Sequence, residues 1–438
     1  MSGLRRLGRA TAWLFAGRLA GQGLMVLFTV VLAGRLGVAG LGGYAFMAAV
    51  VFLANVVTTF GTDMVLIRDI AATGRATGWS AALAVQVLLS VLAIACIWVA
   101  APFIPGEGPV GIAALRLYAL ALLPSAIFSV ASAGLRGVGR MGTYALVGVA
   151  ASAIQLGATW VLLPSGADLT VVAAVLLGVQ VAVAAMAWAA CAIRIPAFRG
   201  VPPVRASEVV VMARASARIG VLGWLGVFYQ RAALLFLAMV VGPAATGWFA
   251  GAARVVEASR AGHVALFGAL YPVLAGERAT VEPRHGPGES LDGVWPLSVL
   301  YAGAISIGLV VLGPAVIALL YGPAFAPAAG ALTILALTVV PSIVATHRSI
   351  ELLAERRESE TLRALVASLA VLAALLAIVV PVAGWIGACW AILGAELVQA
   401  GALLAVGRRT VWPDARQGGP LTAPGRIADG THELPEPS

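Results

Sequence analysis

Residues 36–44, with the sequence LGVAGLGGY, recur in altered form 205 positions later as residues 241–249, VGPAATGWF. A second pair follows in the same order, because residues 119–125, ALALLPS, match residues 336–342, ALTVVPS, at an offset of 217. The difference of 12 positions (217 minus 205) fits a longer polar loop around residues 275–293. Each match alone is weak. Their common order, with one explicable insertion, predicts a duplicated unit.

The composition places this duplicated chain in a membrane. Of its 438 residues, 61% are apolar and only 11% are charged, and its mean hydropathy is +0.99. Soluble domains carry roughly 25% charged and about 45–50% apolar residues, so a soluble fold of this size could not cover itself with polar surface. The three cysteines lie far apart inside apolar runs, which argues against a disulfide framework and a zinc site. The sequence therefore predicts a polytopic membrane protein.

A membrane helix needs about 20 mostly apolar residues, and the chain offers about twelve such runs. They are 11–34, 42–66, 80–103, 110–133, 143–163, 169–192, 216–241, 246–274, 294–320, 327–354, 362–382 and 385–407. The first run exceeds the roughly 7–15 residues of a signal-peptide core, so we expect it to be retained as a span.

A duplicated unit with six spans keeps the same orientation in both halves. The sequence therefore predicts an all-α fold of two six-helix bundles related by a pseudo-twofold axis along the membrane normal, with the substrate site between them. The expected divisions are an N-terminal bundle at 1–193, a cytoplasmic linker at 194–214, a C-terminal bundle at 215–407 and a disordered cytoplasmic tail at 408–438.

Arginine supplies all of the basic side chains, because the chain contains no lysine. When the N-terminus is placed inside the cell, Arg35 and Arg116 are the arginines left on the outer side, both at the ends of spans. This bias predicts that both termini are cytoplasmic. The net charge of +9 is spread thinly between apolar runs, which fits contact with anionic lipid and gives no indication of nucleic acid.

Pro124 and Pro341 lie inside the expected fourth and tenth spans, at matched positions of the two halves. Each proline removes a helix hydrogen bond and permits a bend. Matched bends suit a transporter with two conformational states, and kinks that serve packing alone are an equal alternative.

Ionisable residues at membrane depth are the first candidates for function, because inserting one costs on the order of 2.5–3.5 kcal/mol. Arg231, Arg254 and Glu257 lie about equally far from the turn at 242–245. At a rise of 1.5 Å per residue that distance is roughly 15–20 Å, so the three side chains are expected side by side near mid-membrane. The candidate substrate-binding residues are Arg18, Arg231, Arg254, Arg260 and Arg348.

A guanidinium is permanently charged and binds phosphate oxygens bidentately, so these arginines suit an anionic head group such as pyrophosphate or an acidic sugar. The alternative is mutual neutralisation in ion pairs that only hold helices together. Glu257 lies three residues from both Arg254 and Arg260 and can neutralise only one arginine, which leaves positive charge at this depth.

Other polar residues of the spans have two readings each. The candidates for carrying a coupling proton or sodium ion are Asp63, Glu257, His347 and Glu351. A carboxylate beside arginine is more often simply paired. The amide side chains of the spans are expected mainly to join helices, and those on spans 1, 2 and 7 are also candidates for contact with sugar hydroxyls.

Six stretches of the chain have a familiar order and spacing, which extends to about residue 407. They are residues 36–44, FGTD at 60–63, IRDIA at 67–71, residues 247–257, YPVL at 271–274 and LYGPAFAPAA at 320–329. Each motif is loose, but together they resemble the polysaccharide flippases of the multidrug/oligosaccharidyl-lipid/polysaccharide exporter superfamily.

The resemblance implies two six-helix bundles that form a V around a central cavity. It also implies movement of an undecaprenyl-pyrophosphate-linked oligosaccharide from the cytoplasmic to the outer leaflet of the bacterial inner membrane, by alternating access, for an O-antigen, capsule or exopolysaccharide. The implied partners are this lipid-linked oligosaccharide and the bilayer, with a polysaccharide polymerase and glycosyltransferases as further candidates. Many relatives carry an acid in mid span 7, where this chain has Ala232 and Ala233, so no ion-coupling role is carried over to that span.

Two alternatives stay open at this point. A multidrug exporter of the same superfamily would share the fold, but its cavity for organic cations should be acidic or aromatic rather than rich in arginine. A membrane enzyme of glycan assembly would need a catalytic loop outside the bilayer, and the expected outer loops are short, with Glu107 and Asp168 as their only acids. We therefore expect a transporter and no enzyme, with no cofactor and no metal.

Overall fold

The computed structural model describes residues 2–105, 108–200, 202–260, 295–354 and 357–406, and the regular structure within these ranges is helical. The α-helices are α1 (Ser2–Thr59), α2 (Thr62–Thr73), α3 (Trp79–Ala100), α4 (Pro109–Ala119), α5 (Leu122–Gly137), α6 (Met141–Leu162), α7 (Leu169–Arg194), α8 (Ala206–Val240), a helical segment at 243–260, α11 (Trp295–Tyr321), α12 (Ala328–Leu337), α13 (Val339–Ala354), α14 (Glu358–Ala383) and α15 (Trp385–Ala405). Short 3-10 helices follow α3, α7 and α11 at Ala101–Phe103, Pro196–Arg199 and Pro323–Phe325.

Ten helices in the described ranges are long and apolar enough to cross a membrane. The first of them, Leu19–Thr59, has 41 residues and covers parts of two expected spans. It contains most of the expected first span, 11–34, and the expected second span, 42–66, as far as Thr59. The expected eighth span, 246–274, lies partly outside the described residues. The prediction of an all-α, multi-pass membrane protein is confirmed.

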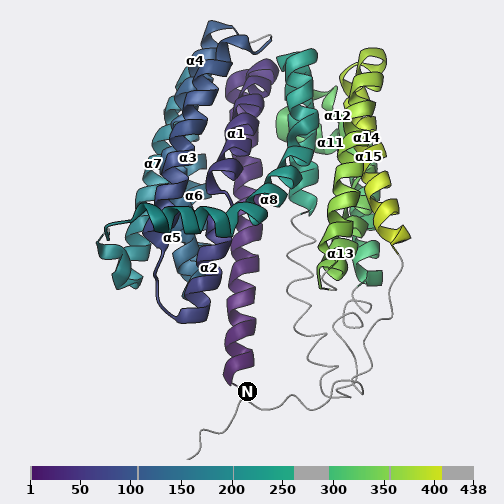
Figure 1. Ribbon diagram of the computed structural model, residues 1–438. Helices are drawn as coiled ribbons and strands as arrows, with labels where there is room; N and C mark the ends of the chain where they lie inside the picture. Colours follow the sequence, from purple (N-terminus) through teal and green to yellow (C-terminus); the bar gives the residue numbers. More distant parts are fainter. Residues whose placement is uncertain (1, 106–107, 201, 261–294, 355–356, 407–438) are drawn as a thin grey trace, which may run out of the picture.

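A kink at Gly37 divides α1 into two helices. Gly37 has φ 70° and ψ −172°, a conformation that glycine adopts readily because it has no Cβ. The N-terminus and α2 both lie at the lower end of the molecule in Figure 1. The two parts of α1 therefore run in opposite directions, and the kink is the turn between the first two spans.

The expected second span, 42–66, is not one continuous helix. α1 ends at Thr59, Phe60 and Gly61 have positive φ values of 48° and 71°, and α2 then begins at Thr62. A Cβ at Gly61 would lie only 2.9 Å from the backbone nitrogen of Gly220 in α8. The break therefore brings the backbone of the first half directly against α8, which a side chain at this position would prevent.

Figure 1 shows α1 to α7 gathered on one side and α11 to α15 on the other, and we call these groups the N-lobe and the C-lobe. α8 passes between them, in contact with α1, α2 and α3 of the N-lobe and with α14 and α15 of the C-lobe. Its first part runs across the N-lobe, and its second part, Ile219–Val240, is a candidate membrane span. α8 begins at Ala206, inside the segment 194–214 that the sequence analysis treats as a linker.

The expected fourth and tenth spans are each divided into two helices. α4 ends at Ala119 and α5 begins at Leu122, whereas α12 ends at Leu337 and α13 begins at Val339. Each new helix starts two residues before a proline, Pro124 or Pro341. The prolines thus occupy the first helical turn, where a missing N–H leaves no intrahelical bond unmade.

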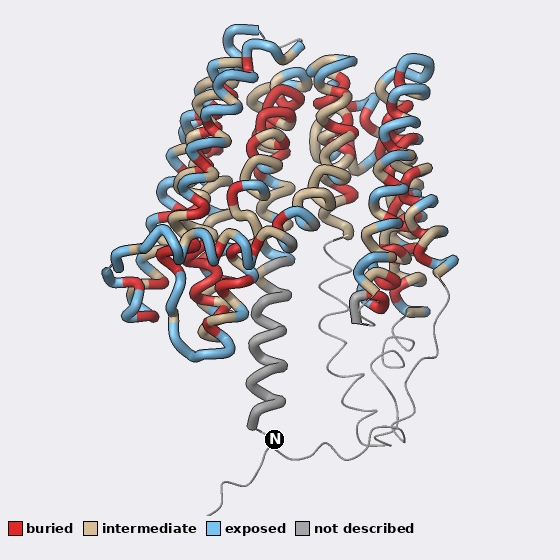
Figure 2. Tube along the Cα trace, viewed as in Figure 1, coloured by how far each residue is buried: buried red, intermediate tan, exposed pale blue. Residues whose placement is uncertain are grey.

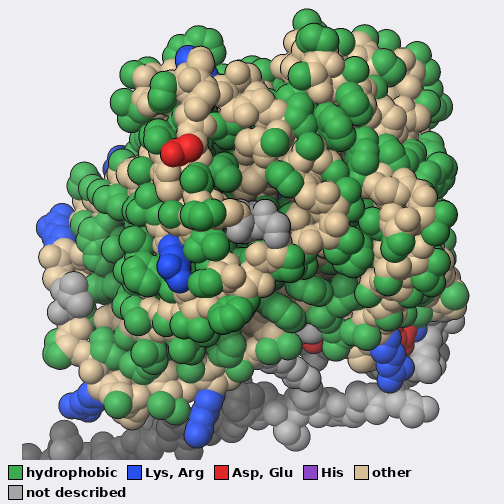
Figure 3. All heavy atoms as spheres, turned by 90° about the horizontal axis from the view of Figure 1, so that it is seen from above, with side chains coloured by type: hydrophobic (Ala, Val, Ile, Leu, Met, Phe, Trp, Pro, Cys, Tyr) green, Lys and Arg blue, Asp and Glu red, His purple; other side chains and the backbone are tan. Residues whose placement is uncertain are grey.

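The burial pattern is that of a protein with an apolar exterior. Figure 2 shows buried residues concentrated on the inner helices and exposed residues on the outer faces. Many exposed side chains are large and apolar, such as Leu319 and Val382, which are 86% and 87% exposed. Figure 3 shows the upper end covered mainly by hydrophobic and uncharged groups, with few charges. These surfaces suit contact with lipid rather than with water.

The first repeated pair of stretches, 36–44 and 241–249, is in contact between the N-lobe and the segment 243–260. A Cβ at Gly42 would lie 1.8 Å from the carbonyl oxygen of Pro243, and a Cβ at Gly247 would lie 2.0 Å from the carbonyl oxygen of Val38. Gly42 and Gly247 occupy the same position in the repeat, as do Val38 and Pro243. The contact is therefore reciprocal, as a pseudo-twofold axis between the repeats requires. We call it the glycine contact.

Candidate functional site

A cavity of about 330 Å³ lies between the N-lobe and the part of the chain that begins with α8. Five helices of the N-lobe, α1 and α4 to α7, supply one wall, and α8 with the segment 243–260 supplies the other. The lining residues are Met25, Thr29, Leu41, Tyr44, Ala45, Ala48, Ala49, Val51, Phe52, Asn55, Tyr118, Ser125, Gln155, Gln180, Arg231, Leu234, Ala250, Ala253, Arg254 and Glu257. We call it the central cavity.

Arg231, Arg254 and Glu257 meet in this cavity, as their positions in the sequence predict. Nη1 of Arg231 lies 3.1 Å from Oε1 of Glu257, and Nη1 of Arg254 lies 3.1 Å from Oε2 of the same carboxylate. Both arginines donate hydrogen bonds to it. One carboxylate therefore bridges two guanidinium groups, and the cluster carries a net charge of +1.

The three charged side chains are partly open to the cavity. The exposed fractions are 25% for Arg231, 21% for Arg254 and 39% for Glu257. The guanidinium of Arg231 also lies over the ring of Phe52, at 5.3 Å from its centroid, which is a cation–π contact. Nε of Arg231 is buried without a hydrogen-bond partner among the described residues. The exposed parts of the two guanidiniums thus leave donors available for an anion.

The described polar residues of the opposite wall are uncharged. Asn55, an amide of the expected second span, is among the sequence candidates for contact with sugar hydroxyls, whereas Gln155 and Gln180 are not. Gln180 donates from Nε2 to Oγ of Ser125 at 3.0 Å, and Gln155 lies on the same wall. Oδ1 of Asn55 is buried with no hydrogen-bond partner among the described residues. Amides and hydroxyls inside apolar helices usually join helices, so no sequence signal separates those that face a cavity.

Arg260 does not line the central cavity. Its Nη2 donates to Oγ1 of Thr338 at 2.6 Å and to the Thr338 carbonyl oxygen at 3.3 Å, and lies 3.8 Å from Oε1 of Glu396. Thr338 lies at the break between α12 and α13, and Glu396 is buried on α15. Glu257 lies three residues from both Arg254 and Arg260, so the sequence allows it to pair with either arginine. In the structure it pairs with Arg254, and Arg260 faces Glu396 instead.

The pair Arg348 and Glu351 also lies away from the central cavity. The two side chains form a buried ion pair, and Arg348 donates from Nη2 to the carbonyl oxygen of Val406 at 2.7 Å. Val406 directly follows the last residue of α15. The C-terminal end of a helix carries a partial negative charge, which favours a guanidinium there. His347 is buried nearby, with its Nε2 at 2.7 Å from Oγ of Ser298.

Two further candidates are placed in the N-lobe. Asp63, in the first turn of α2, is bridged by Arg136 of α5 at 3.2 Å, and it does not line the central cavity. Arg18 is a residue of α1, and its side chain lies outside the described residues.

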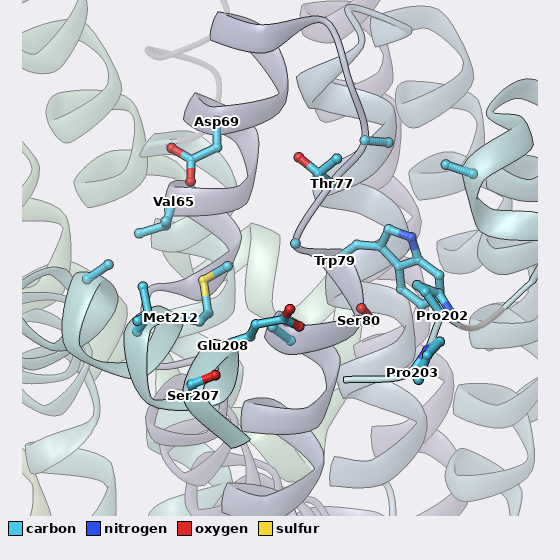
Figure 4. Close-up of a pocket in the computed structure, with 16 residues that line it drawn as sticks. Val65, Asp69, Thr77, Trp79, Ser80, Pro202, Pro203, Ser207, Glu208 and Met212 are labelled. Atoms are coloured by element: carbon cyan, nitrogen blue, oxygen red, sulfur yellow. The ribbon is translucent and has the colours of Figure 1, made fainter. Parts of the chain in front are cut away.

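A second hollow of about 570 Å³ lies between the α2–α3 turn and the first part of α8, as Figure 4 shows. Asp69 and Glu208 are its charged lining residues. Oδ1 of Asp69 accepts from Nε of Arg68 at 2.9 Å, and the Glu208 carboxylate accepts from the backbone N–H of Arg205 at the start of α8. Both acids have local partners, so this hollow offers no counterpart to the arginine cluster of the central cavity.

The fold is shared with a class of solved membrane transporters. The chain is similar to a transporter of the multidrug/oligosaccharidyl-lipid/polysaccharide (MOP) exporter superfamily from Pyrococcus furiosus. The TM-score is 0.64 and the identity 15%, with coverage of 91% of this chain and 94% of that one. It is also similar to the lipid II flippase MurJ in an inward closed conformation, with a TM-score of 0.72, 12% identity and coverage of 90% and 86%. A multidrug resistance MATE transporter in an inward-facing conformation is also similar, with a TM-score of 0.64, 15% identity, and coverage of 88% of this chain and 93% of that one.

These likenesses establish that the chain has the fold of MOP-superfamily transporters. No curated protein sequence matches it. The model of one family does match, over residues 7–276, and its description is polysaccharide biosynthesis protein. The chain belongs to this family.

Proposed function

We propose that the protein moves an undecaprenyl-pyrophosphate-linked oligosaccharide from the cytoplasmic to the outer leaflet of a bacterial inner membrane, for the synthesis of a surface polysaccharide. The observation that carries this proposal is the bridged cluster of Arg231, Glu257 and Arg254 in the central cavity. A net positive charge at this depth suits an anionic head group that must cross the bilayer.

The chemistry of the cluster matches a pyrophosphate. Each guanidinium offers five N–H donors in a planar fork, and each makes one described hydrogen bond to Glu257. The remaining donors of Arg231 and Arg254 are enough for bidentate contacts with phosphate oxygens. The low polarity of the surrounding helices strengthens such contacts relative to water.

Family membership and fold support the same proposal. The family model is named for polysaccharide biosynthesis, and one neighbour of the same fold is a flippase for lipid II. Alternating access would follow from movement of the N-lobe against the C-lobe around the central cavity. The distribution of arginine supports cytoplasmic termini, which would make the upper end in Figure 1 the outer end.

A multidrug exporter is the second candidate, because a MATE transporter shares the fold. Exported organic cations would need negative charge in the central cavity. Its one described acid, Glu257, is already bridged by two arginines, so the electrostatics favour an anion.

A glycan-assembly enzyme is the third candidate function. The central cavity offers one bridged carboxylate but no nucleophile paired with a base among its described lining residues.

The test is complementation of a deletion strain. We expect Arg231→Ala and Arg254→Ala to reach the membrane at wild-type levels and to abolish surface glycan, while lipid-linked oligosaccharide accumulates in the inner leaflet. Arg35→Ala is the matched control, because Arg35 donates to Ser165 and Trp160 at the upper end, outside the central cavity. Normal surface glycan in the deletion strain, with increased sensitivity to cationic drugs, would favour the exporter instead.

A further inference from the structure

The lining of the central cavity is divided by chemistry along the boundary between its two walls. All of its charged residues, Arg231, Arg254 and Glu257, come from α8 and the segment 243–260. All of its uncharged polar residues come from the N-lobe wall. They are Thr29, Tyr44, Asn55, Tyr118, Ser125, Gln155 and Gln180.

This division separates two kinds of ligand chemistry. An anionic group gains from the guanidiniums on one wall and finds no cation among the described lining residues of the other. Amides and hydroxyls both donate and accept hydrogen bonds, which matches the hydroxyl groups of a neutral sugar. A sugar with a carboxylate would meet no counter-charge among the described residues of the N-lobe wall, so desolvating it there would be unfavourable.

We infer that the N-lobe wall is a separate binding subsite for an uncharged sugar, next to the arginine cluster that holds the pyrophosphate. This inference rests on the proposed function and adds to it the class of sugar and the residues that recognise it. The ligand would then bridge the two walls, with its phosphates on the α8 side and its first sugar on the N-lobe side.

Two features of the wall carry the assignment. Asn55 lines the central cavity, and its Oδ1 is buried with no described hydrogen-bond partner, so a turn of this amide toward the cavity would satisfy it with a hydroxyl donor of the ligand. The hydrogen bond from Gln180 to Ser125 holds two helices, α7 and α5, in register at the cavity surface. Oε1 of Gln180 makes no described hydrogen bond inside the protein, so it is available as an acceptor.

The experiment compares two probes on purified wild-type protein and its variants. One probe is undecaprenyl pyrophosphate without sugar, and the other is the undecaprenyl-pyrophosphate-linked oligosaccharide extracted from the deletion strain. We expect Asn55→Ala and Gln155→Ala each to weaken binding of the glycolipid about 3–10-fold, the effect of one lost hydrogen bond, and to leave binding of the sugar-free lipid unchanged. Arg254→Ala should weaken both.

Gln399→Ala is the matched control, because Gln399 is a half-buried amide on α15 that does not line the central cavity. If wild-type protein binds neither probe, the proposed function fails. If it binds both probes equally tightly, the sugar subsite is refuted while the function stands, and this result needs no variant to fold. Equal weakening of both probes by Asn55→Ala, with a lower melting temperature, would show a packing role and also refute the subsite.

Discussion

Glu257 is the residue on which the charge of the central cavity depends. Its carboxylate accepts from Arg231 and Arg254 at the same time, at 3.1 Å each. It keeps two like charges close together, and it competes with any anion for their donors. A bound phosphate therefore shares the two guanidiniums with a carboxylate that repels it, which limits affinity and helps release.

This competition makes Glu257→Gln a specific test. The amide is nearly isosteric but neutral, so the net charge of the cluster rises from +1 to +2. We expect binding of undecaprenyl pyrophosphate to tighten about 3–10-fold, in proportion to the strength of a charge-assisted hydrogen bond, and export to slow because release slows. Titration of purified protein and quantification of surface glycan measure the two effects. Weaker binding in the variant would contradict the competition, and export that no longer responds to a collapsed proton gradient would assign Glu257 a coupling role.

The sequence predicts the level of Arg231, Arg254 and Glu257 but not every partner. Helical rise is constant, so equal distances from the turn at 242–245 place the three residues at one depth. The sequence does not predict whether Arg254 or Arg260 is the second partner of Glu257, because both arginines are three residues away from it. The choice depends on α12 and α15, which supply Thr338 and Glu396 to Arg260.

At the scale of elements, Arg260 links the α12–α13 break to α15. The carbonyl of Thr338 accepts from the backbone N–H of Ser342 in α13, and the guanidinium of Arg260 adds hydrogen bonds to this carbonyl and to the Thr338 hydroxyl. The same group faces Glu396, whose side chain is 9% exposed. Arg260 thus provides both a hydrogen bond at the break and the nearest described positive charge to a buried acid.

Removing this group should destabilise the C-lobe. Arg260→Ala leaves Glu396 buried without its cation, at a cost of roughly 2 kcal/mol, below the range for fully buried pairs because Arg260 is 31% exposed. We expect a lower melting temperature in detergent, and partial recovery in the double variant with Glu396→Gln, which removes the unpaired charge. A double variant less stable than Arg260→Ala alone would contradict the pairing.

Asp168 controls the start of α7 and provides a pH-dependent test. Hydrogen bonds from the Thr170 hydroxyl and from the backbone N–H of Val171 hold the pKa of Asp168 below its ordinary value of 3.8. A lowered pKa in the folded state contributes stability that is present above about pH 4 and is lost as the pH falls through the folded-state pKa. We expect Asp168→Ala to melt earlier than wild type at pH 6, and the difference to shrink below about pH 4. A constant difference would contradict the ionic contribution.

The elements show which features a linear pattern can reveal. The breaks near Pro124 and Pro341 are predictable, because proline marks them directly. The break at Phe60 and Gly61 is not, since Gly61 is one of 51 glycines and the close approach that excludes a Cβ there comes from Gly220, far along the chain. The helical start of α8 is hidden by the arginines and prolines before it, although buried Met212 and Ser216 have the spacing of a helix face.

At the scale of the whole molecule, the glycine contact joins the two repeats at the upper end. Gly42 fits against Pro243, and Gly247 fits against Val38, with no room for a Cβ on either glycine. Rocking the N-lobe away from the segment 243–260 at this end would have to separate both pairs at once, because they are reciprocal. The contact is therefore the closed position of an outer gate, if the upper end faces outward as we propose.

A bulky residue at one glycine should hold this gate open. Gly42→Leu cannot form the contact, because its Cβ would already lie 1.8 Å from the Pro243 oxygen. We expect a cysteine at Ala253, on the wall of the central cavity, to react several-fold faster with an impermeant thiol reagent added outside intact cells, in a background in which the native cysteines are replaced. Export should fall, because the inward-facing state is lost.

Gly34→Leu is the matched control for this experiment, since Gly34 lies in α1 just before the kink at Gly37 and a Cβ there meets no atom within 4 Å. It should leave both labelling and export near wild type. Unchanged labelling in Gly42→Leu, with normal export, would mean that the lobes tolerate separation at this point and that the gate lies elsewhere. Faster labelling from the cytoplasmic side alone would instead reverse the proposed orientation, because the glycine contact would then close the inner end.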